Sequence, residues 1–487
     1  MRHLSSPAIR RARIVPLALV GTLGCAGTSG QHTAQGPDLK SPFAAPVCPT
    51  PALSAATEQP TSAPPEVPVP HADQAVLLTH ARLIDGTGAA PREGVSVLVR
   101  GARIEAIGPD LEAPAGARTI DLAGATLLPG FIDAHTHLTF DPPPSYAEGV
   151  ARDMAESDAD RVLRGVSNAR ATLLAGFTTV RNVGGTFADR ALRDAIRDGR
   201  VLGPRMLVAN HSIGITGGHC DDSNALRPGI FGDEVDYRQG VGDGPDELRK
   251  AVRYQVKHGA DVIKICATGG VLSQGDGVGA PQLTEEEMRT IVEEAVRAER
   301  KVAAHAHGNL GIREAVRAGV HSIEHGSVLD RQTVAMMKRK NVVLVPTTYV
   351  GRYVVEQAEA GALSPDSARK AREIAPKMRA SFKLALEAGV TIALGSDAGV
   401  FPHGDNAQEF ATMVALGMKP MDAIVAGTST AAKLLGLSDL GTIEPGKRAD
   451  LVVVTGDPLA DIHALEHPKL VMKEGAIVRD ELSNTTP

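Results

Sequence analysis

The 487-residue sequence contains no tryptophan, and aromatic residues make up only 3% of it. Stacking platforms for bases or sugars are therefore scarce. The formal net charge of −6 provides no basic field that would attract phosphates. Both features argue against nucleic acid as a partner. The hydrophobic content of 43% and the charged content of 22% are ordinary for a globular protein, and the length allows one large domain with smaller appendages.

Cysteine is also scarce. The four cysteines, Cys25, Cys48, Cys220 and Cys266, form no CxxC motif and show no framework spacing. We therefore expect one cysteine that is processed on export and three free thiols, and no disulfide scaffold. Cys220 and Cys266 could lie near a functional site, but nothing in the pattern assigns them a role.

Residues 1–25 have the composition of an export signal. Four arginines precede a short apolar stretch at 14–23, which is too brief to span a bilayer as a helix. Small residues surround Cys25, and this segment resembles a bacterial lipobox, although Thr22 stands where leucine is usual. We expect export across the inner membrane, to the periplasm or to a membrane-anchored lipoprotein. Simple cleavage and release is the alternative, and a twin-arginine route is weakly indicated.

Residues 26–75 are expected to form an extended tether. Nine of the 32 prolines lie between residues 42 and 70, mixed with alanine, serine and threonine. Such a segment cannot bury enough apolar surface to fold. A lipid anchor followed by this tether would hold a folded domain away from a membrane.

Both ends of the remaining chain have β-strand patterns. Residues 95–100 alternate apolar and polar side chains, and residues 451–454 form an apolar run. Neither end is long enough for a stable sheet alone. We therefore predict one small β-sandwich domain assembled from residues 76–128 and 440–487.

Residues 129–439 alternate short apolar runs with helical segments, which is typical of βα units around a parallel sheet. Thr284 and Glu287 form a capping box that predicts a helix start. Eight candidate strands follow the pattern: 127–134, 178–181, 206–209, 262–265, 302–305, 322–325, 343–347 and 391–397. The predicted fold class is α/β, a (β/α)8 TIM barrel, in which chemistry gathers at the carboxyl ends of the strands.

Polar side chains stand at these strand ends. His135 and His137 are two residues apart at the end of the first strand, so both imidazoles face one side and could bind a metal. Lys264 lies in an apolar strand, where an unpaired ammonium is costly. The other strand-end residues are His305 (with His307 nearby), His325 and Asp397. Their shared position predicts a single site.

From about residue 76 to 480 the chain resembles the amidohydrolase superfamily. The segments that carry the resemblance are PGFIDAHTHL, DVIKI, IEHG, GSDAG and GTIEPGKRADLVVV. The resemblance implies a binuclear centre with two divalent metals: His135, His137 and Asp397 hold one, His305 and His325 the other, and a CO2-carboxylated Lys264 bridges them. Imidazoles and carboxylates suit zinc, and manganese, cobalt and nickel are alternatives. His305 is preferred to His307 because of its 20-residue interval to His325.

The implied reaction is hydrolysis. A metal-bridged hydroxide attacks a carbonyl carbon, and Asp397 is the general base and acid; Lys264 and Asp397 are therefore the catalytic candidates. The segment 257–307 and residues 216–219 resemble a dipeptidase and carboxypeptidase branch, whose members release amino acids such as Pro, Arg or Lys from dipeptides and N-acyl amino acids, and whose relatives cleave ochratoxin-like amides. His219, Tyr237 and His307 are the substrate-binding candidates, with Tyr237 in a possible lid at 229–245.

Two other functions remain open at this point. One is a cyclic-amide hydrolase of the imidazolonepropionase type, and the other is a metal-free barrel that only binds a ligand. The expected partner is a small molecule or dipeptide. We expect membrane contact only through the N-terminal anchor. The sequence does not decide the oligomeric state, and a homo-oligomer is one alternative.

Overall fold

The computed structural model describes residues 67–68, 74–224, 226–229 and 235–482. The predicted export signal and nearly all of the predicted tether lie outside these residues. In the described ranges, no helix is long and apolar enough to cross a membrane.

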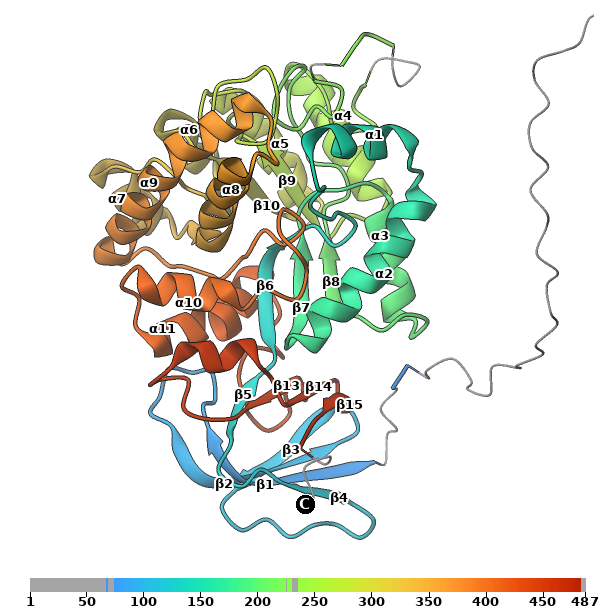
Figure 1. Cartoon of the computed structure of the whole chain (residues 1–487), viewed down its shortest axis with the longest axis vertical. Coiled ribbons are helices and arrows are strands. Elements are labelled where there is room, and N and C mark those ends of the chain that lie inside the picture. Colours follow the sequence, from blue (N-terminus) through green and yellow to red (C-terminus); the bar gives the residue numbers. More distant parts are fainter. Residues whose placement is uncertain (1–66, 69–73, 225, 230–234, 483–487) are drawn as a thin grey trace, which may run out of the picture. The chain divides into compact units, whose positions relative to one another are not determined.

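Strands from both ends of the chain form one eight-stranded sheet (Figure 1). Its order is β15-β14-β13-β5-β1-β2-β3, and β4 pairs with β1. The ends meet where β13 lies antiparallel to β5, with Val452 opposite Leu128. The strands are β1 (Ala75–Leu83), β2 (Arg92–Arg100), β3 (Arg103–Gly108), β4 (Arg118–Asp121), β5 (Thr126–Pro129), β13 (Leu451–Val454), β14 (Leu470–Lys473) and β15 (Ala476–Asp480).

A common apolar core covers this end sheet. It contains alternate residues of β1 and β2, such as Leu78 and Val97, together with Leu451 and Met472 from the other end of the chain. Burying these side chains requires both ends at once, which explains the split domain. The ladders connect all eight strands into one sheet, and the predicted sandwich remains a prediction.

The middle of the chain forms two parallel sheets. The first has the order β6-β7-β8 and the second β12-β11-β10-β9. Their strands are β6 (Phe131–Thr136), β7 (Phe177–Asn182), β8 (Arg205–Val208), β9 (Val262–Cys266), β10 (Lys301–Ala306), β11 (Ser322–His325) and β12 (Val343–Val345). Bridges link the two sheets at both sides: Ile213 pairs with Ile265, and residues 391–398 pair with Leu344 and with Thr136.

Helices alternate with these strands and surround them in the view of Figure 1. The helix α5 begins at the predicted capping box, because Thr284 accepts from the Glu287 backbone and the Glu287 carboxylate accepts from the Thr284 backbone. The α-helices are α1 (Tyr146–Ala155), α2 (Asp158–Leu174), α3 (Ala188–Arg197), α4 (Pro245–Lys257), α5 (Glu285–Arg297), α6 (Asn309–Ala318), α7 (Arg331–Lys340), α8 (Thr348–Ala360), α9 (Pro365–Ala388), α10 (Gln408–Ala415), α11 (Pro420–Val425) and α12 (Ala431–Leu435).

Two predicted strands differ in the structure. The run 127–134 is divided at Gly130 between β5 of the end sheet and β6 of the parallel sheet. A side chain at Gly130 would collide with Thr178, so glycine permits the close approach of β6 and β7 there. Residues 391–397 are extended but form no strand, since their hydrogen bonds alternate between partners and Asp397 has a left-handed φ of 67°.

Candidate metal centre

The two histidines at the end of β6 face Asp397. The Nδ1 of His135 is 2.8 Å from a carboxylate oxygen of Glu324, and the Nδ1 of His137 donates to the Gly184 carbonyl at 2.8 Å. These contacts hold both rings by Nδ1. One oxygen of Asp397 is then 3.4 Å from the Nε2 of His135 and 3.2 Å from that of His137. The arrangement leaves three potential ligand atoms directed at one point.

A second group consists of His305, His307 and His325, which come from the ends of β10 and β11. Their ligand nitrogens all lie within 4.8 Å of one another, and the same holds for the two nitrogens and the carboxylate oxygen of the first group. The Nδ1 of His307 contacts the Ser327 hydroxyl at 2.6 Å, and that of His325 contacts Thr347 at 2.8 Å. The Nε2 of His305 is buried and has no hydrogen-bond partner among the described residues. An orphaned imidazole nitrogen here fits a metal site.

Lys264 lies between the groups on β9. Its Nζ is 3.5 Å from the Nε2 of His135, and it makes no ion pair within the described part of the chain. Burial lowers the pKa of Lys264 to about 8, despite the charges of Glu324 and Asp397. With this pKa, a substantial fraction of the Lys264 amine is neutral at pH 8, and the neutral amine is the form that reacts with CO2.

Asp397 and His325 both have strained backbones, with φ of 67° and 68°. Asp397 is held in this conformation by its N–H, which donates to the His135 carbonyl at 2.8 Å. Burial alone would raise the pKa of Asp397, but the neighbouring His135 and His137 outweigh it and lower that pKa. The carboxylate is therefore charged at neutral pH. Strain of this kind is often found where side chains are aimed at a reacting centre.

Two charged residues beneath this centre were missed by the sequence analysis. Glu324 bridges His135 and the guanidinium of Arg181, which lies 2.8 Å away, and both charges are almost completely buried. Burial opposes ionisation, but Arg181 and the hydrogen bond from His135 hold the pKa of Glu324 at about 2. Arg181 also donates to the Ala134 carbonyl at 2.6 Å. The sequence signal for this pair was a charged residue inside each of two buried strands, Arg181 in FTTVRN and Glu324 in SIEH.

Asp133 on β6 hydrogen-bonds to residues 391–397, the extended segment that forms no strand. Its carboxylate accepts from the backbone N–H groups of His135 and Ser396, both at 3.0 Å, and from the Asn406 amide at 2.8 Å. Burial raises the pKa of Asp133 to about 6 against these hydrogen bonds. The contacts fix the relative position of His135 and Asp397.

All six predicted ligands line one cavity of 480 Å³, a size typical of small-molecule sites. Away from the ligands its wall is largely apolar. The apolar wall comes from the β6–α1 region, α8 and α9 and contains Phe140, Pro142, Pro143, Tyr146, Val150, Val350, Tyr353, Val354, Leu363, Ile374 and Met378. The cavity therefore combines a polar, metal-ligating end with an apolar surface.

Of the substrate-binding candidates, His219 and His307 line the cavity. The His219 ring stacks on His305 with centroids 4.1 Å apart, and the His307 ring stacks on His325 at 5.0 Å. Tyr237 is not among the lining residues. Its ring packs edge-on against Tyr254 at 5.4 Å and lies beneath the ammonium of Lys250, and the predicted lid around it includes undescribed residues.

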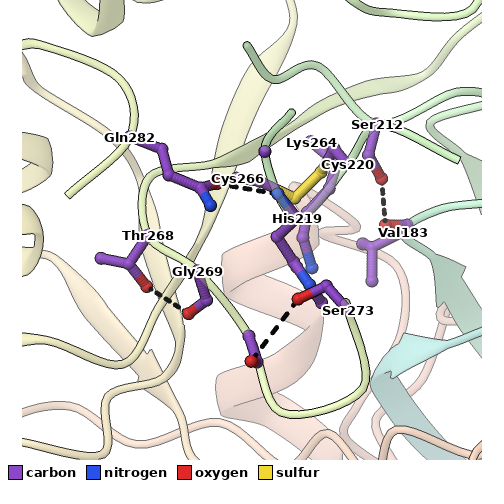
Figure 2. The surroundings of a disulfide bond; sticks show 12 residues. Val183, Ser212, His219, Cys220, Lys264, Cys266, Thr268, Gly269, Ser273 and Gln282 are labelled. Carbon is purple, nitrogen blue, oxygen red and sulfur yellow. Dashed lines mark hydrogen bonds between the residues drawn. A yellow bond between two sulfur atoms is a disulfide. The ribbon is translucent and has the colours of Figure 1, made fainter. Parts of the chain in front are cut away.

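The expectation of free thiols is wrong for Cys220 and Cys266, which form a disulfide (Figure 2). Their Cα atoms are 5.9 Å apart although 46 residues separate them in sequence. The fold brings the loop after β8 alongside the end of β9, a proximity that cysteine spacing cannot reveal.

Residues 126–478 match the Amidohydrolase family over most of the chain. The chain belongs to this family. Family membership implies the (β/α)8 barrel, which agrees with the parallel β6–β12 sheets and the bridges between them.

Several amidohydrolases are similar to this one. An ochratoxinase from Aspergillus niger is 36% identical over 361 residues, which cover 71% of this chain and 73% of that protein. The crystal structure of a Xaa-Pro dipeptidase with bound methionine is 38% identical and superposes with a TM-score of 0.80, covering 83% of this chain and all of the other. An imidazolonepropionase from Cutibacterium acnes is more distant, at 24% identity over 371 residues, 73% of this chain and 83% of that protein.

These similarities place the amidohydrolase in the dipeptidase and ochratoxinase-like branch of its superfamily. It is a hydrolase that acts on amide or peptide bonds. A metal-free barrel that only binds ligands does not fit this assignment.

Proposed function

We propose that this amidohydrolase uses two divalent metal ions to hydrolyse the amide bond of dipeptides or N-acyl amino acids, with release of the C-terminal amino acid. The observation that carries the proposal is the pair of ligand groups, His135–His137–Asp397 and His305–His307–His325, in one cavity with an apolar wall. Because their donors are imidazoles and a carboxylate, zinc suits the site.

Within this proposal, His135, His137 and Asp397 would hold one metal, and His305 and His325 would hold the other. A carboxylated Lys264 would be a further ligand. Carboxylation would replace a buried cation that has no ion-pair partner in the described residues with an anion beside two cations. The metals, when bound, polarise the scissile carbonyl and lower the pKa of water.

Asp397 is the general base and general acid of the proposed reaction. Its low pKa keeps it as a carboxylate at neutral pH, so it can take a proton from the attacking water and return it to the leaving nitrogen. Its strained backbone and its hydrogen bond to His135 keep the carboxylate directed into the cavity.

The substrate is proposed to lie with its α-carboxylate near His219 and His307 and its apolar groups against α8 and α9. Burial lowers the pKa of His219 to about 4 and that of His307 to about 3. Both rings are then neutral at pH 7 and bind a carboxylate by N–H donation. The apolar wall suits apolar groups of the substrate.

The test is a hydrolysis panel with metal-loaded protein. It contains N-acetyl-L-phenylalanine, N-acetyl-L-methionine, L-alanyl-L-proline and L-alanyl-L-arginine, and it includes imidazolonepropionate and hydantoin as cyclic amides. Release of free amino acids with little ring opening supports the proposal. Efficient ring opening alone would favour the imidazolonepropionase-like alternative instead.

The metal content of two variants shows whether the ligand is His305, on β10, or His307, directly after its end. If His305 is the ligand, H305A loses about one equivalent of metal and H307A keeps both but binds substrate weakly. The reverse pattern would exchange the two roles.

Export to the periplasm or to a lipid anchor, proposed from residues 1–25, is tested separately by fractionation of cells that produce the full chain.

A further inference from the structure

A disulfide lies at the edge of the candidate metal centre. Cys266 is the last residue of β9, two residues after Lys264, and Cys220 directly follows His219. Both cysteines line the cavity. Figure 2 shows the disulfide beside Lys264 and His219.

The His219 ring occupies a narrow slot. One face stacks on the ring of His305 at 4.1 Å. On another side the ring lies so close to Gly270 that a Cβ there would be only 2.2–2.7 Å from its atoms. The Nδ1 of His219 is buried and has no hydrogen-bond partner among the described residues. The stacking and the close contact with Gly270 therefore position the ring at the cavity wall.

The segment that carries His219 has few other attachments. Residues 216–224 contain no large apolar side chain, and Asp221 hydrogen-bonds within the segment, to Gly217 and Ser223. Among the described residues outside the segment, the His219 N–H donates to Gln282 at 2.9 Å, the Asn224 amide donates to the Gln274 carbonyl at 2.6 Å, and the Thr216 N–H donates to the Asp243 carboxylate at 3.2 Å. The disulfide is its covalent attachment to β9.

We propose that the Cys220–Cys266 disulfide positions His219 for substrate binding, so that substrate affinity depends on the oxidised cysteine pair. The inference rests on the proposed function, in which His219 binds the substrate carboxylate. Cys220 and Cys266 are positioning residues and do not touch the reacting atoms. A dithiol reductant would reverse the effect: it transfers two electrons and two protons, the S–S bond breaks to give two thiols, and the reductant becomes a cyclic disulfide.

Loss of the disulfide has to be separated from the appearance of thiols near the metals. A thiolate is a soft ligand that binds zinc well, and Cys266 lies opposite His305 in the β9–β10 ladder. The C220S/C266S double variant removes the disulfide without leaving either thiol. Comparison with reduced wild type therefore distinguishes displacement of His219 from competition for metal.

The experiment measures kcat, KM and metal content of the metal-loaded full chain on the panel substrate with the highest kcat/KM. We expect C220S/C266S to raise KM about tenfold, the effect of losing one substrate hydrogen bond, with metal content unchanged and kcat changed far less. G270A displaces the same ring without touching sulfur and should raise KM similarly. Combined with C220S/C266S it should add little, because both changes act through His219.

Gly277 provides the matched control. It lies in the same loop as Gly270, has no left-handed φ, and an added Cβ would make only an ordinary 3.5 Å contact with Ala280. G277A should therefore keep the wild-type KM. Reduction of wild type by a dithiol should raise KM, and reoxidation should restore it.

An unchanged KM in C220S/C266S, or additive effects with G270A, would overturn the inference. So would a loss seen only in reduced wild type, because that pattern indicates competition by thiols. If the serine variants do not fold, G270A and reversible reduction of wild type decide the question. A wild-type chain that hydrolyses no panel substrate overturns the proposed function and this inference together, whereas an active wild type with an insensitive KM overturns only the inference.

Discussion

The buried pair beneath the metal centre offers a quantitative test of how His135 is supported. Substitution of Arg181 by methionine keeps much of the side-chain volume but leaves the Glu324 carboxylate without its cation. Glu324 is fully buried and Arg181 is 2% exposed, so solvent cannot replace the lost partner. Removing one member of such a pair typically costs about 3–5 kcal/mol.

The pKa of Glu324 supports a similar magnitude. Its decrease from 4.5 to about 2 corresponds to about 3 kcal/mol in favour of the folded carboxylate, at about 1.4 kcal/mol for each tenfold change. Because the folded pKa is below the unfolded one, this stability is fully present above pH 4.5 and is lost as the pH falls towards 2. The deficit of R181M should therefore shrink in acid.

Urea denaturation of metal-free protein at pH 7 measures the effect. We expect R181M to lose about 3–5 kcal/mol of unfolding free energy and R181M/E324Q to recover part of it, because the uncompensated charge is gone. R352M is the matched control: Arg352 pairs with Glu356 at 3.4 Å and both are more than half exposed, so its loss should be below about 1 kcal/mol. Metal titration should show an affinity about 10–100-fold weaker in R181M, since Glu324 orients His135. An R181M protein as stable as R352M, with normal metal affinity, would refute this reasoning.

Three further predictions concern the site itself. D397N should keep the wild-type urea midpoint and lose about 10²–10⁴-fold in kcat, because it cannot accept the proton; a kcat within tenfold of wild type would exclude Asp397 as the base. Reconstitution of metal-free protein with metal, at a constant concentration of dissolved CO2, should be slow well below pH 8 and accelerate through about pH 8, because only the neutral amine of Lys264 reacts with CO2. Mass spectrometry for carboxylated Lys264 checks this, and a flat pH profile at constant dissolved CO2 would contradict it. M378A should improve kcat/KM for bulky relative to small N-acyl amino acids. G351A should do the reverse, because the Cβ of the new alanine would lie 2.6 Å from the Met378 sulfur in the cavity wall. Equal changes for both substrate sizes would show that α8 and α9 do not contact the substrate.

Local pattern was sufficient for the positions of most elements. Alternation in residues 95–100, the apolar runs that became β7 to β12, and the capping box at Thr284 depend on neighbours a few residues away, which the sequence displays directly. The same local rule placed His135, His137 and His305 at strand ends, because side chains two apart share a face and parallel strands end at one edge. The family similarity agrees with that α/β assignment.

Where local pattern failed, a distant contact decided. Residues 391–397 have strand composition, but their hydrogen bonds alternate between partners and Asp397 is left-handed, so no ladder forms. The apolar run 127–134 divides at Gly130 because β5 pairs with β1 and β13 of the end sheet, whereas β6 pairs with β7 of the parallel sheet.

The sequence by itself determined which residues could bind metals and at which strand ends they stand, because burial and side-chain alternation are properties of short segments. Only the tertiary structure decided that Arg181 lies against Glu324, that Tyr237 packs outside the cavity, and that Cys220 and Cys266 are joined. Each of these depends on the distance between residues far apart in the chain. Such distances are set by the packing of the whole fold and leave no periodic trace in the sequence.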